Sequence, residues 1–304
     1  MKRIITIIGL LTFAVSGYAQ QEIQISQYMF NGMFLNPAYA GTHDYWSGSL
    51  LYRNQWVSFP GAPKTGLLSI DGPIKDKNMG LGFMATTEKI GLTQVTDVSA
   101  AYSYRIKVGS KGGQLSFGLR AGVRNQTFNI SDLQNITDPG DPLYNANQSV
   151  WTPKFDFGVY YYTTRGYLGL SVPSVVTIDS RKVDNTDAGL RRHFFLNGGY
   201  VFKLSNTVDF KPSFLVKYEP SAPISADINA HFLFNERLWL GASYRHNAAV
   251  VGMVEFQVSP KLRIGYAFDY TTSGIRTYQS GSHEIMLGYD FIQQLTKIKN
   301  PRYF

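Results

Sequence analysis

The chain has 304 residues and no cysteine, which excludes disulfides and thiolate metal sites. It has 29 Lys and Arg residues against 21 Asp and Glu, a formal net charge of +8, and no basic run longer than two residues, which argues against a nucleic-acid-binding face. The 20 Tyr, 20 Phe and 29 Gly residues, beside only 16% charged residues, favour a β protein with aromatic girdles.

Residues 1–19 have the pattern of a secretory signal peptide. Lys2 and Arg3 form a positive n-region, residues 4–15 form an apolar h-region, and Gly17-Tyr18-Ala19 is a small-x-small site, so we expect cleavage after Ala19. No cysteine follows that could carry a lipoprotein anchor, and no later stretch approaches the ~18 apolar residues of a transmembrane helix. The sequence therefore predicts an exported protein.

Residues 20–44 show no long hydrophobic period, and we expect them to fold against or into the domain that follows. They contain a turn cluster, because Pro fixes φ and Gly tolerates positive φ. Two interpretations stay open: a plug or hinge at the mouth of a barrel, or a turn leading into the first strand. We favour the plug, because the segment precedes the first strand without forming one. The cluster comprises Asn36, Pro37, Ala38, Tyr39, Ala40 and Gly41.

From residue 45, apolar and polar side chains alternate in about fourteen runs. At ~9–11 residues, such runs are long enough to cross a bilayer as tilted strands. The last run places Ile285, Leu287, Tyr289 and Phe291 on one face, which suits a closing strand. The runs lie near 45–56, 65–73, 79–88, 94–107, 113–129, 154–163, 166–174, 191–204, 207–218, 223–234, 237–246, 248–258, 261–272 and 281–292.

The connections between these runs also alternate. Tight connections follow every second run, whereas several of the others are longer, above all 130–153 and 175–190. Short turns on one side and long loops on the other are typical of an outer-membrane barrel with both termini in the periplasm.

The polar face of the runs carries charges that a soluble core would bury at high cost, whereas a wet lumen accepts them. We therefore predict an all-β fold: a transmembrane antiparallel β-barrel of about 14 strands over residues 45–292, preceded by a plug-like segment and followed by a periplasmic tail, 293–304. A soluble barrel or sandwich is the alternative. The charges are Arg53, Asp97, Arg105, Arg120, Arg124, Asp156, Asp209, Lys211, Asp227, Arg245, Glu255, Arg263, Asp269, Glu284 and Asp290.

Three motifs closely resemble the PorP/SprF family of outer-membrane proteins, which is associated with type IX secretion and gliding motility. The first motif is the turn cluster. The second consists of Arg53-Asn54-Gln55-Trp56 together with Pro60-Gly61, and the third is the C-terminal sequence 300–304. The resemblance implies a barrel that binds the C-terminal domain of a large secreted client, often an adhesin, and helps export it or anchor it at the cell surface. Periplasmic or lipoprotein components of the machinery are implied as further partners. The alternative is a plugged channel for a small solute.

The sequence has no motif that is typical of enzymatic chemistry. The five histidines form no H-E-x-x-H pair, and the sequence has no P-loop, G-x-S-x-G or G-x-G-x-x-G motif. We predict no enzyme activity, cofactor or metal. For Arg53 we weigh a contact that pins the N-terminal segment against an ordinary pair with a carboxylate such as Glu284. For Trp46 and Trp56 we favour positions in interfacial girdles.

The long loops are the predicted partner surface because they are polar and carry several acidic and aromatic side chains. The residues concerned are Asp132, Asp138, Asp141, Tyr144, Trp151, Asp179 and Asp184.

Overall fold

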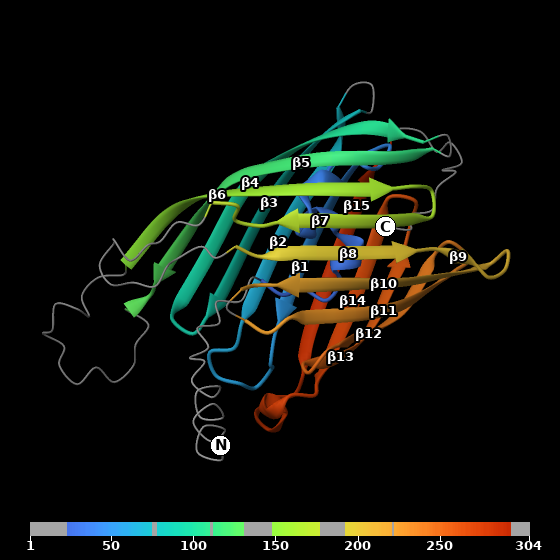
Figure 1. Ribbon diagram of the computed structural model, residues 1–304. Helices are drawn as coiled ribbons and strands as arrows, with labels where there is room; N and C mark the ends of the chain where they lie inside the picture. The colour runs from blue at the N-terminus through green and yellow to red at the C-terminus, as the bar shows by residue number, and fades with distance from the viewer. Residues whose placement is uncertain are drawn as a thin grey trace, which may run out of the picture.

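The computed structural model describes residues 23–74, 78–109, 112–130, 148–176, 192–220 and 222–292. They form one closed antiparallel β-barrel (Figure 1), which confirms the predicted fold class. Its strands are β1 Trp46–Asn54, β2 Lys64–Ile74, β3 Met79–Ile90, β4 Thr93–Val108, β5 Gly113–Phe128, β6 Gln148–Tyr162, β7 Gly166–Val172, β8 Phe194–Tyr200, β9 Phe202–Lys203, β10 Val208–Tyr218, β11 Ser225–Phe234, β12 Leu238–Arg245, β13 Ala249–Gln257, β14 Leu262–Thr271 and β15 Ser282–Phe291.

The barrel closes where its last strand meets its first. β15 pairs with β1 from Trp46↔Phe291 to Asn54↔His283. β8 and β9 both pair with β10 and are two parts of one wall strand, so the wall has 14 strands. Every strand pairs antiparallel with its neighbours, so each hairpin follows the chain order.

Successive side chains point to opposite faces of a strand, and this alternation separates the two faces of the wall. On β14, Arg263 and Asp269 are buried, whereas Ile264, Tyr266 and Tyr270 are exposed on the outside. The charged residues that the sequence assigned to the lumen all face inward. The outward residues form the apolar surface that a bilayer covers.

The two mouths of the barrel differ. We call one the turn end: it carries the tight connections 75–78, 109–112, 163–165, 204–207, 235–237 and 258–261. At the loop end the connections are 55–63, 91–92, 129–147, 173–193, 219–224, 246–248 and 272–281, the last containing the 3-10 helix η7 Gly274–Tyr278. Figure 1 shows the turn end at the right.

One boundary differs from the sequence prediction. Residues 148–153, expected in a loop, belong to β6, which pairs with β5 from Phe128↔Gln148 onward. Trp151 is therefore a strand residue with its side chain outside, 69% exposed, while Thr152 and Lys154 face inward. The alternation continues through Pro153, and polar residues beyond the apolar band extend the strand instead of ending it.

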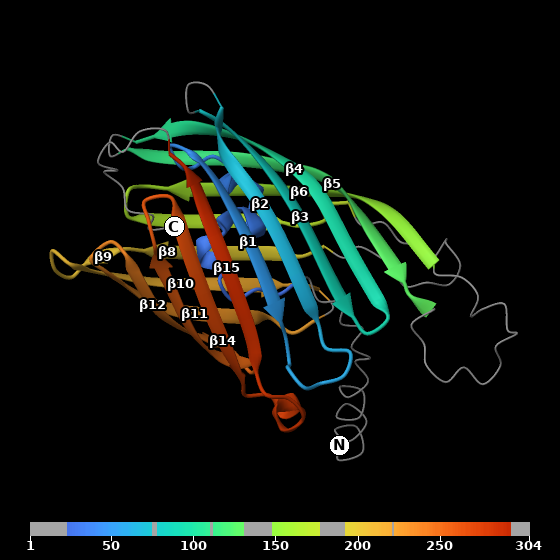
Figure 2. The ribbon, with the colours of Figure 1, turned by 180° about the vertical axis from the view of Figure 1, so that it is seen from behind.

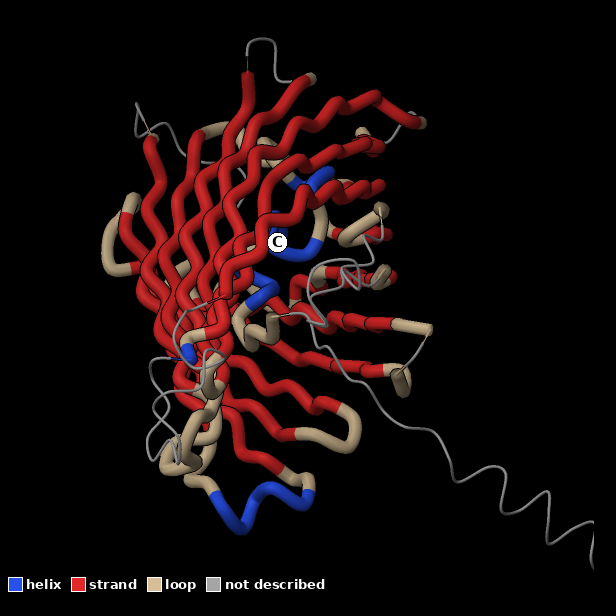
Figure 3. Tube along the Cα trace, turned by 90° about the vertical axis from the view of Figure 1, so that its left-hand side faces the viewer, coloured by secondary structure: helices blue, strands red, loops and turns tan. Residues whose placement is uncertain are grey.

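Residues 23–44 of the N-terminal segment lie inside the barrel (Figures 2 and 3). Its short helices are η1 Tyr28–Phe30, α2 Gly32–Leu35 and η2 Pro37–Tyr39, and its apolar residues form much of the buried core. We call residues 23–44 the plug. Among the described residues, no helix is both long and apolar enough to cross a bilayer.

Candidate functional site

The plug runs through the lumen from the loop end to the turn end. Near the loop end, the backbone N–H groups of Ser26 and Gln27 donate to Glu284 at 2.8 and 2.7 Å. Near the turn end, the N–H of Gly41 donates to Asp71 at 2.8 Å. The plug then continues into β1, which starts at the turn end, where β15 finishes. The described chain therefore begins and ends at opposite mouths.

A cluster of buried charges holds the first residues of the plug. Arg53 pairs with Asp269 at 2.8 Å and with Glu284 at 3.2 Å, and it also donates to the Ser26 hydroxyl at 3.0 Å. Arg245 pairs with Asp269 at 3.2 Å. Because these guanidinium and carboxylate groups are buried away from water, each charge is stabilised by its oppositely charged partners. Arg53 therefore has both of the contacts that were weighed for it: it pairs with Glu284, and it contacts the plug through Ser26.

The middle of the plug contacts opposite sides of the wall. The Tyr28 hydroxyl accepts a hydrogen bond from Asn229 at 2.8 Å. Arg120, paired with Asp156 at 2.5 Å, donates to the Met33 carbonyl at 2.9 Å. The plug is thus bonded to the wall along its length.

The turn cluster fixes the second half of the plug. The Asn36 amide donates to the carbonyls of Val159 and Leu170 at 3.0 and 3.2 Å, and its oxygen caps η2 by accepting from the Ala38 N–H. Ser116 donates to the Ala38 carbonyl, and a second wall serine, Ser103, donates to the Ala40 carbonyl, both at 2.6 Å. The cluster is a docking segment, as the plug interpretation expects.

Glycines on the inner wall leave room for this segment. A Cβ added at Gly118 would lie 2.2 Å from the Ala38 nitrogen, and one at Gly80 would lie 2.1 Å from the Ala40 oxygen. At Gly41, φ is +67°, a conformation that favours glycine. The role of these wall glycines was not predicted from the sequence, although their inward positions in the alternation could have indicated a close backbone approach.

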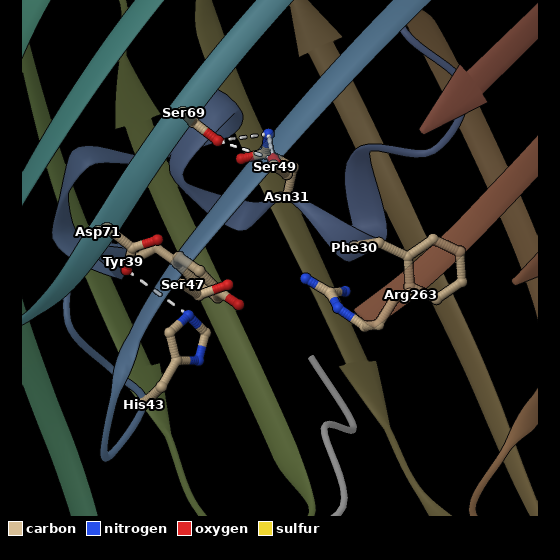
Figure 4. Close-up of a pocket in the computed structure, with 9 residues that line it drawn as sticks. All are labelled: Phe30, Asn31, Tyr39, His43, Ser47, Ser49, Ser69, Asp71 and Arg263. Atoms are coloured by element: carbon tan, nitrogen blue, oxygen red, sulfur yellow. Dashed lines mark hydrogen bonds and ion pairs between the residues drawn. The ribbon is translucent and has the colours of Figure 1, made fainter. Parts of the chain in front are cut away.

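Beside the plug, between β1, β2 and β14, lies a pocket of about 10 Å³, room for about one water (Figure 4). Asn31 reaches across this space and donates to Ser49 and Ser69 at 2.8 and 2.9 Å. The His43 Nε2 atom lies 3.5 Å from the Asp71 Oδ2 atom. This part of the lumen is filled by side chains.

The second motif builds the rim at the loop end. The Trp56 N–H donates to the Ser282 hydroxyl, and Val57 exchanges two backbone hydrogen bonds of 2.8 Å with the β14–β15 loop. Gly91, in the β3–β4 turn, donates to the Gly61 carbonyl at 2.9 Å. Trp56 and Ser58 both have positive φ, +47° and +77°. Pro60, Gly61 and Asn54 line an open pocket of about 520 Å³, which we call the rim pocket.

Of the predicted partner residues, the structure places only Trp151. The others lie outside the described residues: Asp132, Asp138, Asp141, Tyr144, Asp179 and Asp184. Within the described ranges, no group of three or more acidic or histidine side chains is arranged to hold a metal.

Comparisons with known proteins agree with this architecture. The family described as type IX secretion system membrane protein PorP/SprF matches residues 17–289. No curated protein matches the chain. The fold is similar to the crystal structure of the Acinetobacter baumannii outer membrane protein Omp33, with a TM-score of 0.50 and 9% identity over 83% of this chain and 100% of that one. A mutant of the TodX monoaromatic hydrocarbon channel has a TM-score of 0.49 and 12% identity, over 88% of this chain and 94% of that one.

Proposed function

Because the chain belongs to the PorP/SprF family of type IX secretion system membrane proteins, we propose that it is a non-enzymatic partner barrel of that machinery. It binds the C-terminal domain of a large secreted client, an adhesin in our proposal, and helps export the client or anchor it at the cell surface. Periplasmic or lipoprotein components of the secretion and gliding apparatus bind its turn end. In this arrangement the loop end faces outside, as long loops do in outer-membrane barrels.

The observation that carries the proposal is the docked plug. Residues of two family motifs take part in the docking. Arg53 on the wall contacts Ser26 near one end of the plug, and the turn cluster near the other end accepts hydrogen bonds from Ser116 and Ser103 of the wall. A lumen filled in this way suits a barrel that binds partners at its two ends rather than one that conducts solutes through its lumen. These motif residues therefore keep the lumen closed, and a partner docks on the closed barrel.

The client surface in this proposal is the loop end around residues 131–147 and 177–191. Their acidic side chains suit a client domain with basic groups, and Trp151 stands beside the first of these segments with 69% of its surface exposed. Exposed tryptophans are frequent anchors of protein interfaces.

The test replaces residues 131–147 or 177–191 with a short Gly-Ser linker and follows the client in cells. We expect the client to appear in the medium while the barrel still assembles in the outer membrane. The control shortens the 204–207 turn at the opposite mouth and should leave the client on the cell. Normal retention in both loop variants would contradict the loop assignment.

A second candidate function is a plugged channel for a small solute. The observation in its favour is the 14-stranded wall, whose strand number lies between that of barrels packed solid by side chains and that of aqueous porins. Removal of residues 21–40 tests this candidate in liposomes: increased conductance or solute uptake would support the channel, and an unchanged, closed barrel would count against it.

A further inference from the structure

One strand of the wall has an open edge at the loop end. β6 pairs with β5 along its whole length, but its ladder with β7 ends at Phe157↔Val172. Just beyond this pair, Ser174 has a positive φ of +55° and donates its N–H to Asp156, so the chain after β7 turns out of the sheet. Figure 1 shows β6 extending past the end of β7. We call residues 148–153 the open edge.

The backbone direction shows which groups this edge presents. The N–H and C=O of a strand residue point toward the same neighbouring strand, and successive residues alternate between the two neighbours. The Phe155 carbonyl accepts the Val175 N–H at 2.7 Å, which is on the β7 side. Ser149, Trp151 and Pro153 therefore turn their backbone groups to this side as well. Within the described ranges, no other backbone group bonds to them there.

The position of Pro153 agrees with an unpaired edge. Proline has no N–H to give to a ladder, so within sheets it is found where that group would face no partner strand. The edge then offers the carbonyl of Pro153 and both backbone groups of Ser149 and Trp151. A row of unpaired donors and acceptors of this kind is a template for one more strand.

The outer face of the open edge is apolar. Trp151, Pro153 and Phe155 all point outward, and the two aromatic side chains are 69% and 47% exposed. A strand added to this edge would place one of its own outward side chains beside Trp151. Cross-strand pairs of an aromatic side chain with another aromatic or a β-branched one stabilise a sheet. The edge therefore fits an extended segment that carries such a residue on its outward face.

A second copy of the barrel does not fit this edge. Equivalent edges of two identical strands can meet in a sheet only when the strands run antiparallel. Two barrels in one membrane are related by rotation about the membrane normal, and this rotation keeps both β6 strands running in the same sense across the membrane. The occupant is therefore a strand of another protein.

We propose that the open edge binds an extended strand of the client's C-terminal domain by β-strand addition. Backbone hydrogen bonds to Ser149, Trp151 and Pro153 supply affinity, and an aromatic or β-branched client residue packed on Trp151 supplies selectivity. The identity of the partner rests on the proposed function, which places the client at this mouth. The inference adds how the client is held.

The test uses the tagged full-length barrel together with the large secreted protein that co-purifies with it, and measures how fast that protein is lost from the immobilised barrel during washing. Ser149→Pro removes an edge N–H without removing a bond to β5, and should raise the rate of loss about tenfold. Trp151→Ala should raise it about 30-fold. The matched control is Tyr278→Ala, in the β14–β15 loop, which removes an aromatic side chain that is 70% exposed and should leave the rate unchanged.

A photo-crosslinking residue, p-benzoylphenylalanine, in place of the exposed Gln148 identifies the occupant. We expect crosslinks to the C-terminal domain of the co-purified protein. Crosslinks only to residues 177–191 of the same chain, or to a second barrel, would overturn the proposal.

The rates separate this inference from the proposed function. If no secreted protein co-purifies with the unaltered barrel, both fail. If one co-purifies and both edge variants retain it as the unaltered barrel does, only the open-edge inference fails. Heat-dependent gel mobility shows whether each variant is folded, and Trp151→Ala carries the test if Ser149→Pro does not fold.

Discussion

Replacing Glu284 by Gln should loosen the plug without changing the shape of the wall. Glu284 is fully buried, and its two carboxylate oxygens accept the backbone N–H groups of Ser26 and Gln27 while also pairing with Arg53. An amide of the same size has only one acceptor oxygen. Its NH2 group would face a donor, either an N–H of the plug or the guanidinium.

The expected loss follows from these contacts. A hydrogen bond to a charged group contributes about 1.5–3 kcal/mol, and leaving a buried donor unsatisfied adds a similar penalty. At the lower end of both ranges, loss of one such bond with its donor left unsatisfied costs about 3 kcal/mol, which raises the undocked fraction of the plug about 150-fold.

A single cysteine reports the undocked state, because the natural chain has none. Met33 is fully buried in the plug, so in a Met33→Cys background the rate of maleimide labelling measures undocking. We expect Glu284→Gln to increase this rate about 150-fold. Glu88→Gln is the matched control, because this buried glutamate accepts from Thr65 on the wall at 3.0 Å, and its labelling rate should stay near that of the background. Equal rates in the Glu284 variant and the background would refute the reasoning.

The other predictions concern the turn cluster. Gly118→Ala would press a methyl group against Ala38 and should destabilise the docked plug by about 1–3 kcal/mol, whereas Gly252→Ala, with open space at its Cβ position, should not change Met33→Cys labelling. Asn36→Ala removes two bonds to wall carbonyls and the η2 cap, and should raise labelling by at least tenfold, about 1.4 kcal/mol. Gly41→Ala should lower the unfolding temperature of the barrel, measured by heat-dependent gel mobility, more than Gly109→Ala: both have positive φ, but only Gly41 also meets wall backbone at 2.7 Å.

The wall was predictable from sequence because its determinants are local. Alternation such as that of β14 specifies which face of each strand is apolar, and a one-residue shift would expose Arg263 and Asp269 to lipid. Strand pairing then follows chain order, since each hairpin joins neighbours. The inward position of the charges followed from the same period.

The course of the plug was not predictable in the same way. Its bonds join residues far apart in sequence, such as Ser26 with Glu284 and Asn36 with Val159, and no local period specifies them. The start of β6 was placed too late for a related reason: Trp151 lies on a strand that extends beyond the apolar band, where polar composition resembles that of a loop. The open edge of β6 needed the folded arrangement, because the sequence does not show where β7 stops pairing with β6.

The central claim is that this closed barrel holds a protein client. Mild detergent extraction of outer membranes through a tag on the barrel, followed by mass spectrometry of the co-purified proteins, tests it most directly. We predict recovery of a large secreted protein in near-equal amount, bound through its C-terminal domain. A barrel recovered alone from cells that are actively secreting would contradict the claim and favour the solute channel.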